Sequence, residues 1–125
     1  MASLEKKALS APDRTLEYEK THGDIVDLEG MTVGRYVYQP GWRWVDILAP
    51  VVGTEICQVE HYGYALKGSL RVRHNDGTVT QVQPGDVYHI SPRHLGEVVG
   101  DEAFETIEFL PVARDGAAKR GSAIG

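Results

Sequence analysis

The residues of this chain that are best suited to chemistry lie between positions 55 and 94. Glu55, Cys57 and His61 are two and four residues apart, and His94 follows a Pro-Arg turn. Alternate positions of a strand point to the same side, so 55, 57 and 61 would face together in an extended segment. Thiolate, imidazole and carboxylate groups are the usual protein ligands of divalent transition metals. The spacing therefore indicates a metal or catalytic site.

Each of these residues also has an ordinary structural explanation. His61 could be a half-buried histidine bonded to a backbone carbonyl, and a lone cysteine such as Cys57 is often only a small apolar core residue. Glu55 is either an inward ligand or general base, or a solvated carboxylate at the rim. A one-residue bulge would exchange it for Glu60 as the inward carboxylate. His94 points into the same opening, or it is an exposed loop histidine.

Three aromatic residues are candidates for the wall of a ligand pocket. Trp42 and Trp44 share one face if their segment is a strand, and Tyr64 lies close to His61 in sequence. Indole and phenol rings supply large apolar surfaces on which small molecules stack. The alternative is packing in the core or at an interface.

Short runs of strand-forming residues alternate with Gly, Pro, Asn and Asp turns along most of the chain, which predicts an all-β fold. We expect a polar N-terminal arm over 1–23, one barrel domain over 24–110 and a mobile tail over 111–125. The predicted strands are 25–28, 31–39, 42–47, 54–60, 62–66, 69–74, 78–83, 86–90, 95–99 and 104–109.

The stretch from 55 to 68 resembles the first sequence motif of the cupin superfamily. That motif has two histidines separated by one residue, then a glutamate, and a glycine after six more residues. Gly68 matches the glycine. Counting back places His61 at the glutamate position, and Glu55 and Cys57 at the two histidine positions.

The second cupin motif also has a counterpart. Pro84-Gly85-Asp86 matches its opening and Pro92 its later proline. The usual histidine position falls at Gly96, whereas this chain has His94 two residues earlier. The landmarks of the fold are thus present, while every metal-ligand position is altered.

The resemblance implies a small cupin-like β-barrel of two facing antiparallel sheets, of the jelly-roll type. It also implies a barrel pocket that binds a small molecule, with a divalent metal acting as a Lewis acid in isomerase- or lyase-type chemistry. The alternative is a non-catalytic barrel that binds or senses a small ligand, with or without metal. A metal-free scaffold is a third interpretation. Fold alone does not choose among these activities.

The altered ligand set itself favours one class of metal. Cys57, His61 and His94 would form a Cys-His-His set with an open fourth position, which water, substrate or Glu55 could fill. A thiolate favours a zinc-type ion, with nickel, iron and manganese as the alternatives. A thiol beside an oxygen-activating iron would be exposed to oxidation, which argues against oxygen chemistry.

Composition limits the remaining function classes. The 125 residues suit one domain, and 42% hydrophobic and 25% charged residues are ordinary for a globular protein. A net charge of -5 argues against nucleic acid as a partner, and no apolar run approaches the length of a membrane span. One cysteine and no apolar leader at the start predict a cytoplasmic protein.

For assembly, we expect a homodimer. Small barrels leave an apolar outer sheet face and an edge strand to cover, and the segment up to Tyr38 is suited to pairing across a two-fold axis.

Overall fold

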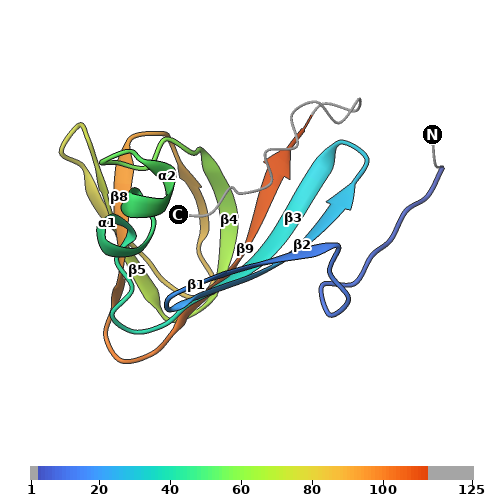
Figure 1. Ribbon diagram of the computed structural model, residues 1–125, viewed down its shortest axis with the longest axis horizontal. Coiled ribbons are helices and arrows are strands. Elements are labelled where there is room, and N and C mark those ends of the chain that lie inside the picture. Colours follow the sequence, from blue (N-terminus) through green and yellow to red (C-terminus); the bar gives the residue numbers. More distant parts are fainter. Residues whose placement is uncertain (1–2, 113–125) are drawn as a thin grey trace.

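The computed structural model describes residues 3–112, and most of them lie in two antiparallel sheets (Figure 1). The larger sheet has six strands, in the spatial order β1 (Arg14–Tyr18), β2 (Thr21–Leu28), β3 (Met31–Tyr38), β9 (Phe104–Pro111), β4 (His61–Lys67) and β7 (Val87–Ile90). The smaller sheet has the order β6 (Val79–Val82), β5 (Ser69–His74) and β8 (His94–Val99). The prediction of an all-β fold is confirmed.

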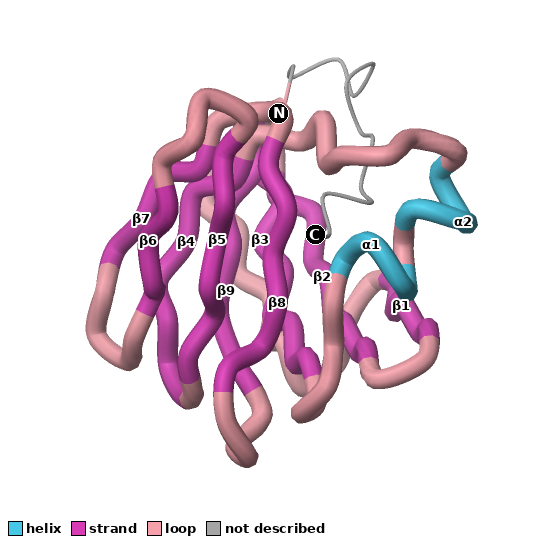
Figure 2. The backbone as a smooth tube through the Cα atoms, turned by 90° about the vertical axis from the view of Figure 1, so that its left-hand side faces the viewer, coloured by secondary structure: helices cyan, strands magenta, loops and turns pink. Residues whose placement is uncertain are grey.

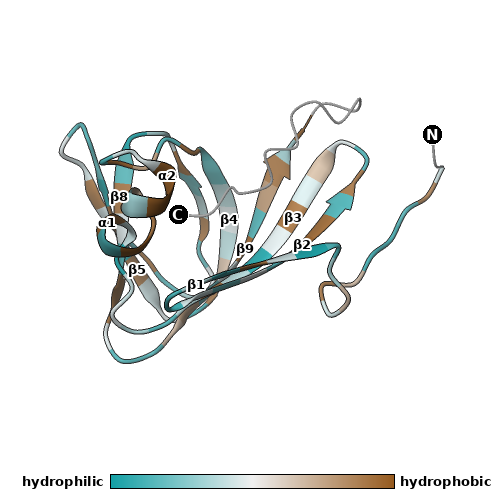
Figure 3. Cartoon of the chain, in the orientation of Figure 1, coloured by the Kyte–Doolittle hydropathy of each residue, from teal (hydrophilic) through white to brown (hydrophobic). Residues whose placement is uncertain are grey.

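The two sheets share one core. Figure 2 shows the smaller sheet in front of the larger one, with both helices to one side. Buried side chains of both sheets, among them Tyr36 and Ala65 from one and Leu70 and Val72 from the other, belong to a single hydrophobic cluster. The strands alternate between apolar and polar residues, as Figure 3 shows in colour. This alternation is the pattern of a sheet with one face in the core and one in solvent.

The larger sheet begins earlier than expected. The segment expected to be a polar arm includes all of β1 and the start of β2, which pair from Arg14↔Ile25 to Tyr18↔Thr21. Leu16 and Tyr18 alternate with exposed residues and pack against the core. Residues 3–13 contain no strand. Most of the expected tail, 113–125, lies outside the described residues.

Residues 42–47 are not the strand that we predicted. Trp44–Ile47 form the short helix α1, and Ala49–Val52 form a second, α2. Trp44 and Leu48 are one helical turn apart and both are buried. The buried positions here are therefore spaced as in a helix and not every second residue as in a strand. Pro50 stands in the first turn of α2, where proline is tolerated, and Gly53 ends this helix in the left-handed conformation at φ 79°. Neither helix in residues 3–112 has the length and apolar character that crossing a bilayer requires.

The predicted strand 54–60 is also wrong. This segment crosses the end of the barrel as a loop, and its backbone pairs with the sheets through one isolated bridge, between Cys57 and His94. The Cys57 N–H donates to the His94 carbonyl over 2.9 Å, and the Cys57 carbonyl accepts from the Arg93 N–H over 2.7 Å. Arg93 takes a φ of 75°, which turns the chain so that β8 starts at His94. Strand alternation does not apply to a loop, so it does not predict which residues of 54–60 face inward.

Glycines on the inner side of the larger sheet make room for tyrosine rings. A Cβ on Gly63 of β4 would lie 2.4 Å from the ring of Tyr88, and one on Gly34 of β3 would lie 2.5 Å from the ring of Tyr36. Real Cβ atoms do not come so close, so a side chain at either position would displace a ring. Gly63 therefore lets Tyr88 lie flat across β4, and this places its hydroxyl beside β9.

Candidate functional site

Cys57, His61 and His94 meet inside the barrel. Cys57 comes from the crossing loop, His61 begins β4 and His94 begins β8. Each offers a ligand atom that lies within 4.8 Å of the other two, and all three side chains are buried. The Cys57 Sγ is 3.7 Å from the His61 Nε2, and the two imidazole rings meet edge to face with centroids 5.0 Å apart. The structure thus brings together the three residues predicted as ligands.

The hydrogen bonds of the two histidines fix which nitrogen faces the cluster. His61 Nδ1 lies 2.8 Å from the Glu108 Oε1, and a carboxylate accepts a proton donor there. His94 Nδ1 donates to the Ser91 carbonyl over 2.9 Å. Both Nδ1 atoms therefore carry their proton outward, which leaves Nε2 as the ligand nitrogen of each ring. A second hydrogen bond of this kind is the usual way in which proteins orient metal-binding histidines.

Glu108 is the buried carboxylate of this site, and it is held by two partners. Its Oε1 meets His61, and its Oε2 accepts from the Tyr88 hydroxyl over 2.6 Å. The same hydroxyl lies 2.7 Å from the Thr106 Oγ1. Burial, together with the charge of Glu108, raises the pKa of Tyr88, so the phenol keeps its proton and remains a donor. The network runs from Tyr88 through Glu108 to His61.

The electrostatics of the cluster favour a thiolate at Cys57. Burial alone would raise the pKa of this thiol, but hydrogen bonds and charge from His61 and His94 outweigh it and lower the pKa to about 6. Burial would lower the pKa of His61, and the charge of Glu108 with the contact to Cys57 instead raises it to about 10. Without a metal, the cluster therefore holds a thiolate beside an imidazolium. A thiolate is also the form of cysteine that binds metals.

The distance between the donor atoms of Cys57 and His61 fits a zinc-type ion. With a Zn–S length of about 2.3 Å and a Zn–N length of about 2.0 Å, a tetrahedral angle separates sulfur and nitrogen by about 3.5 Å. The observed 3.7 Å between the Cys57 Sγ and the His61 Nε2 matches this edge. Catalytic zinc sites have three protein ligands drawn from histidine, cysteine and carboxylate side chains with the fourth position open, and one thiolate with two imidazoles is a set of this kind.

The structure does not place Glu55 with these ligands. Glu55 is exposed, which is the solvated position that the sequence left as its alternative. Glu60 is exposed as well, and it accepts from the surface residue His89 over 2.8 Å. Neither residue is the inward carboxylate; that is Glu108, 47 residues beyond His61. Glu108 lies on β9 with Phe104 and Thr106 on the same buried face, and this alternation was the available signal for it.

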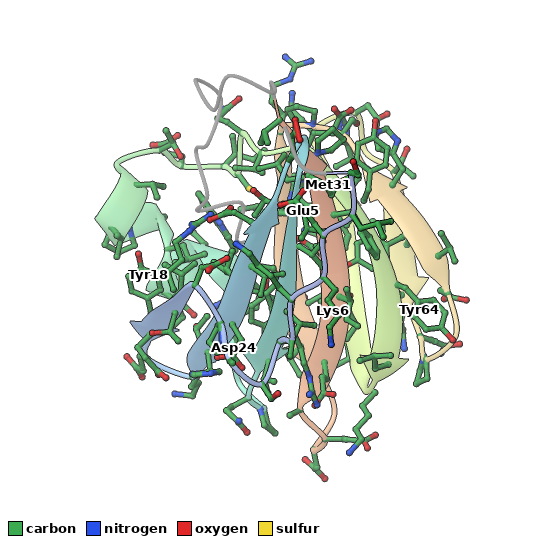
Figure 4. All side chains as sticks on the ribbon, turned by 90° about the vertical axis from the view of Figure 1, so that its right-hand side faces the viewer. Glu5, Lys6, Tyr18, Asp24, Met31 and Tyr64 are labelled. Atoms are coloured by element: carbon green, nitrogen blue, oxygen red, sulfur yellow. The ribbon has the colours of Figure 1, made fainter. Side chains whose placement is uncertain are left out.

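The three aromatic residues predicted to line a pocket lie in three different environments. Trp42 is fully buried and stacks on Tyr38 with centroids 4.3 Å apart, so it belongs to the core. Trp44 is buried and lines a cavity beside Cys57. Tyr64 is 43% exposed on the outer face of the larger sheet, where Figure 4 labels it, so its proposed place in the pocket is wrong. The inward neighbours of Tyr64 on β4 are Gly63 and Ala65.

A cavity of about 210 Å³ reaches the cluster from the side of the two helices. Its floor is formed by the buried residues Trp44, Leu48 and Cys57. Because Cys57 belongs both to the lining of this cavity and to the metal-binding group, a small molecule in the cavity would lie next to the cluster.

A second cavity, of about 220 Å³, lies between β5, β6 and β7 and touches none of the three ligands. At its rim lie a serine, a histidine and an aspartate, Ser91, His74 and Asp76, in an order that resembles a hydrolytic triad. The Ser91 Oγ is 3.0 Å from the His74 Nε2. However, His74 Nε2 also donates to the Pro92 carbonyl, and Nδ1 accepts from the Asp76 N–H. This tautomer has no lone pair for the serine proton, so the arrangement is structural.

The sequence matches no family model, and no curated protein sequence matches it significantly. Solved structures do match. Ectoine synthase from P. lautus superposes with a TM-score of 0.63 at 11% identity, covering 90% of this chain and 83% of that one. The polyketide cyclase RemF from Streptomyces resistomycificus gives 0.59 at 16% identity, covering 86% and 79%. A cupin-like protein from Thermotoga maritima gives 0.52 at 15% identity, covering 73% and 68%.

Identities this low carry information on the fold and not on the activity. The superpositions agree with the two antiparallel sheets, and on these grounds the chain has the cupin fold.

Proposed function

We propose that this cupin-fold protein binds one zinc-type divalent ion through Cys57, His61 and His94, and uses it on a small molecule in the adjoining cavity. The carrying observation is the convergence of three buried donor atoms within 4.8 Å, from three segments of the chain. Such a cluster is costly to bury unless its polar groups have partners. The outward hydrogen bonds of both imidazoles supply these partners and leave Nε2 for the ion.

The ion would act as a Lewis acid that polarises a carbonyl or hydroxyl oxygen of the ligand, as in isomerase- or lyase-type reactions. The chain's own residues have supporting tasks. Glu108 holds the proton on His61 Nδ1 and so keeps Nε2 available, while Tyr88 fixes the carboxylate. Trp44 and Leu48 exclude water from one side of the cavity. Ectoine synthase and the polyketide cyclase, both named as enzymes, support a small-molecule activity for this fold.

Metal analysis tests the proposal. Protein purified without chelator under reducing conditions should contain about one equivalent of zinc-type metal per chain. His61→Ala should abolish metal binding and Cys57→Ser should weaken it, since serine is a poorer ligand for such ions. His89→Ala is the matched control, because His89 also bonds to a glutamate but lies at the surface. Wild-type protein that stays metal-free after dialysis against zinc, nickel, manganese and ferrous iron would contradict the proposal.

One observation favours the alternative of a non-catalytic binding or sensing protein. Both oxygens of Glu108 are already engaged, and the cavity at Cys57 has no Asp, Glu or Lys among its described lining residues. Without a second acid or base, the site can hold a ligand more readily than it can move a proton. A ligand found by thermal-shift screening that is recovered unchanged after long incubation would favour the sensor; a converted ligand would favour the enzyme.

A further inference from the structure

The cavity at Cys57 has a buried end and an end open to solvent. Its floor of Trp44, Leu48 and Cys57 is buried, while three other lining residues, Val52, Thr54 and Gln58, are exposed. The cavity therefore leads from solvent to Cys57, between α2 and the crossing loop. Figure 2 shows the two helices to one side of the sheets, while Trp44 and Leu48 belong to the common core.

The walls of this cavity are apolar and carry no Asp, Glu, Lys or Arg side chain among the described residues. Apolar surface continues outside it, because Val51 and Val52 of α2 are 54% and 56% exposed. A dianion or a phosphorylated compound entering here would lose water without gaining a cationic side chain from the cavity walls, which is costly. A compound with an apolar body would be stabilised by the same walls.

The volume limits the size of the ligand. An apolar protein cavity of about 150 Å³ holds a benzene molecule. The 210 Å³ at Cys57 therefore suits one six-membered ring with a short substituent. The three ligands of the proposed ion, of which Cys57 also lines the cavity, leave one position for a single donor atom of that substituent.

We infer that the ligand is an uncharged compound with one apolar ring and a single metal-binding oxygen or nitrogen, and that it enters between Val52 and Gln58. This inference rests on the proposed function for the contact with the metal, whereas the size and polarity of the cavity do not depend on it. Thr54 and Gln58 provide the polar groups at the mouth. The walls disfavour simple dicarboxylates and sugar phosphates, because they offer no cationic side chain to a second charge.

The experiment compares imidazole with phenylimidazole on cobalt-loaded protein, followed by the visible absorption of the metal. Both probes present one neutral nitrogen, and they differ by a phenyl ring. Burial of that ring should make phenylimidazole bind about tenfold tighter or more. Val52→Trp should remove this advantage by filling the mouth. Val51→Trp should keep it, because Val51 is equally exposed on the same helix but does not line the cavity.

Equal affinity for the two probes would contradict the inference about the ligand but not the metal site. Tighter binding of succinate than of phenylimidazole would have the same meaning. If the protein binds no metal, the proposed metal site is wrong. The size and polarity of the cavity are then tested separately, by nuclear magnetic resonance of the metal-free protein with benzyl alcohol. Shifts at Trp44 and Cys57 that Val52→Trp suppresses would then support the cavity inference. Their absence would overturn it.

Discussion

At the scale of residues, His61 holds the site together because it bonds on both sides. Its Nε2 faces the Cys57 sulfur and its Nδ1 faces the Glu108 carboxylate. A histidine oriented in this way presents one nitrogen in a fixed direction, and the carboxylate behind it increases its basicity. The position of Glu108 depends in turn on Tyr88.

Glu108→Gln should weaken metal binding without unfolding the protein. The amide keeps the shape of the side chain but loses the negative charge that holds the proton on His61 Nδ1. Loss of such a partner lowers metal affinity by about 10- to 100-fold. Competition with a chelating dye measures the change. Glu60→Gln, at a surface glutamate that also bonds to a histidine, should leave the affinity unchanged. Equal losses in both variants would contradict the positioning role of Glu108.

The metal-free protein should show an unusually acidic thiol. The pKa of Cys57 is lowered from 9.0 to about 6, so its contribution to stability is lost as the pH falls through about 6. The pKa of His61 is raised from 6.5 to about 10, so its contribution is lost as the pH rises through about 10. The ion pair therefore stabilises the fold between these limits.

Ultraviolet absorbance of the thiolate, titrated against pH, reports the Cys57 transition directly because the chain has one cysteine. Cys57→Ser serves as the blank. A midpoint near the ordinary pKa of a thiol would show that the histidines do not stabilise the thiolate.

Sequence spacing identified the three ligand candidates but not their surroundings. Cys57, His61 and His94 were recognisable because their residue types are rare and lie at or near motif positions. Glu55 was linked to them by strand alternation, which fails in a loop. Glu108 was missed because its contact with His61 is formed by the pairing of β4 with β9, where Gly63 faces Glu108. The spacing of neighbouring residues cannot predict a contact between residues that are 47 positions apart.

At the scale of elements, the alternation of apolar and polar residues predicted most strands correctly, but it gave the wrong structure for residues 42–60. Strands with one buried face repeat every two residues, and most of the predicted strands have counterparts in the structure. The helix Trp44–Ile47 is too short for a helical period to show, and its tryptophan and valine are residues enriched in strands. The crossing loop contains β-forming residues but has one isolated bridge instead of a ladder.

Two glycines on inner strand faces should differ sharply in their tolerance of a methyl group. Gly63→Ala should destabilise the protein by about 1–3 kcal/mol, because the new Cβ would overlap the Tyr88 ring and push it away from Glu108. Gly96→Ala on β8 should be nearly neutral, since the nearest atom to its Cβ would be 3.6 Å away. Urea unfolding of the metal-free variants measures both. Equal costs would show that the Tyr88 ring yields without penalty.

At the scale of the whole molecule, the outer face of the larger sheet carries exposed apolar side chains on neighbouring strands. Tyr62 and Tyr64 of β4, Val87 of β7 and Phe109 of β9 are all exposed. The register places Tyr64 opposite Val87, and Tyr62 stacks on His89 with ring centroids 4.7 Å apart. Contiguous apolar surface of this kind often belongs to an interface.

We therefore predict a homodimer that buries this face. Light scattering should give twice the chain mass of 13.8 kDa. Val87→Lys should shift the protein toward the monomer, because a charge would then be buried between two copies. Val79→Lys, at an exposed valine on the edge strand of the other sheet, should not. A wild-type protein that remains at 13.8 kDa over a wide concentration range contradicts the prediction.

The position of β9 has a consequence for how the chain acquires its site. This strand is the last in the described sequence, yet it lies in the middle of the larger sheet, between β3 and β4. While the protein is being synthesised, β3 and β4 have no partner between them until Phe104–Pro111 has emerged. The same insertion delivers Glu108 to His61. A nascent chain can therefore present Cys57, His61 and His94 to a metal ion before the residue that orients His61 exists, and folding around β9 must be a late, non-local step.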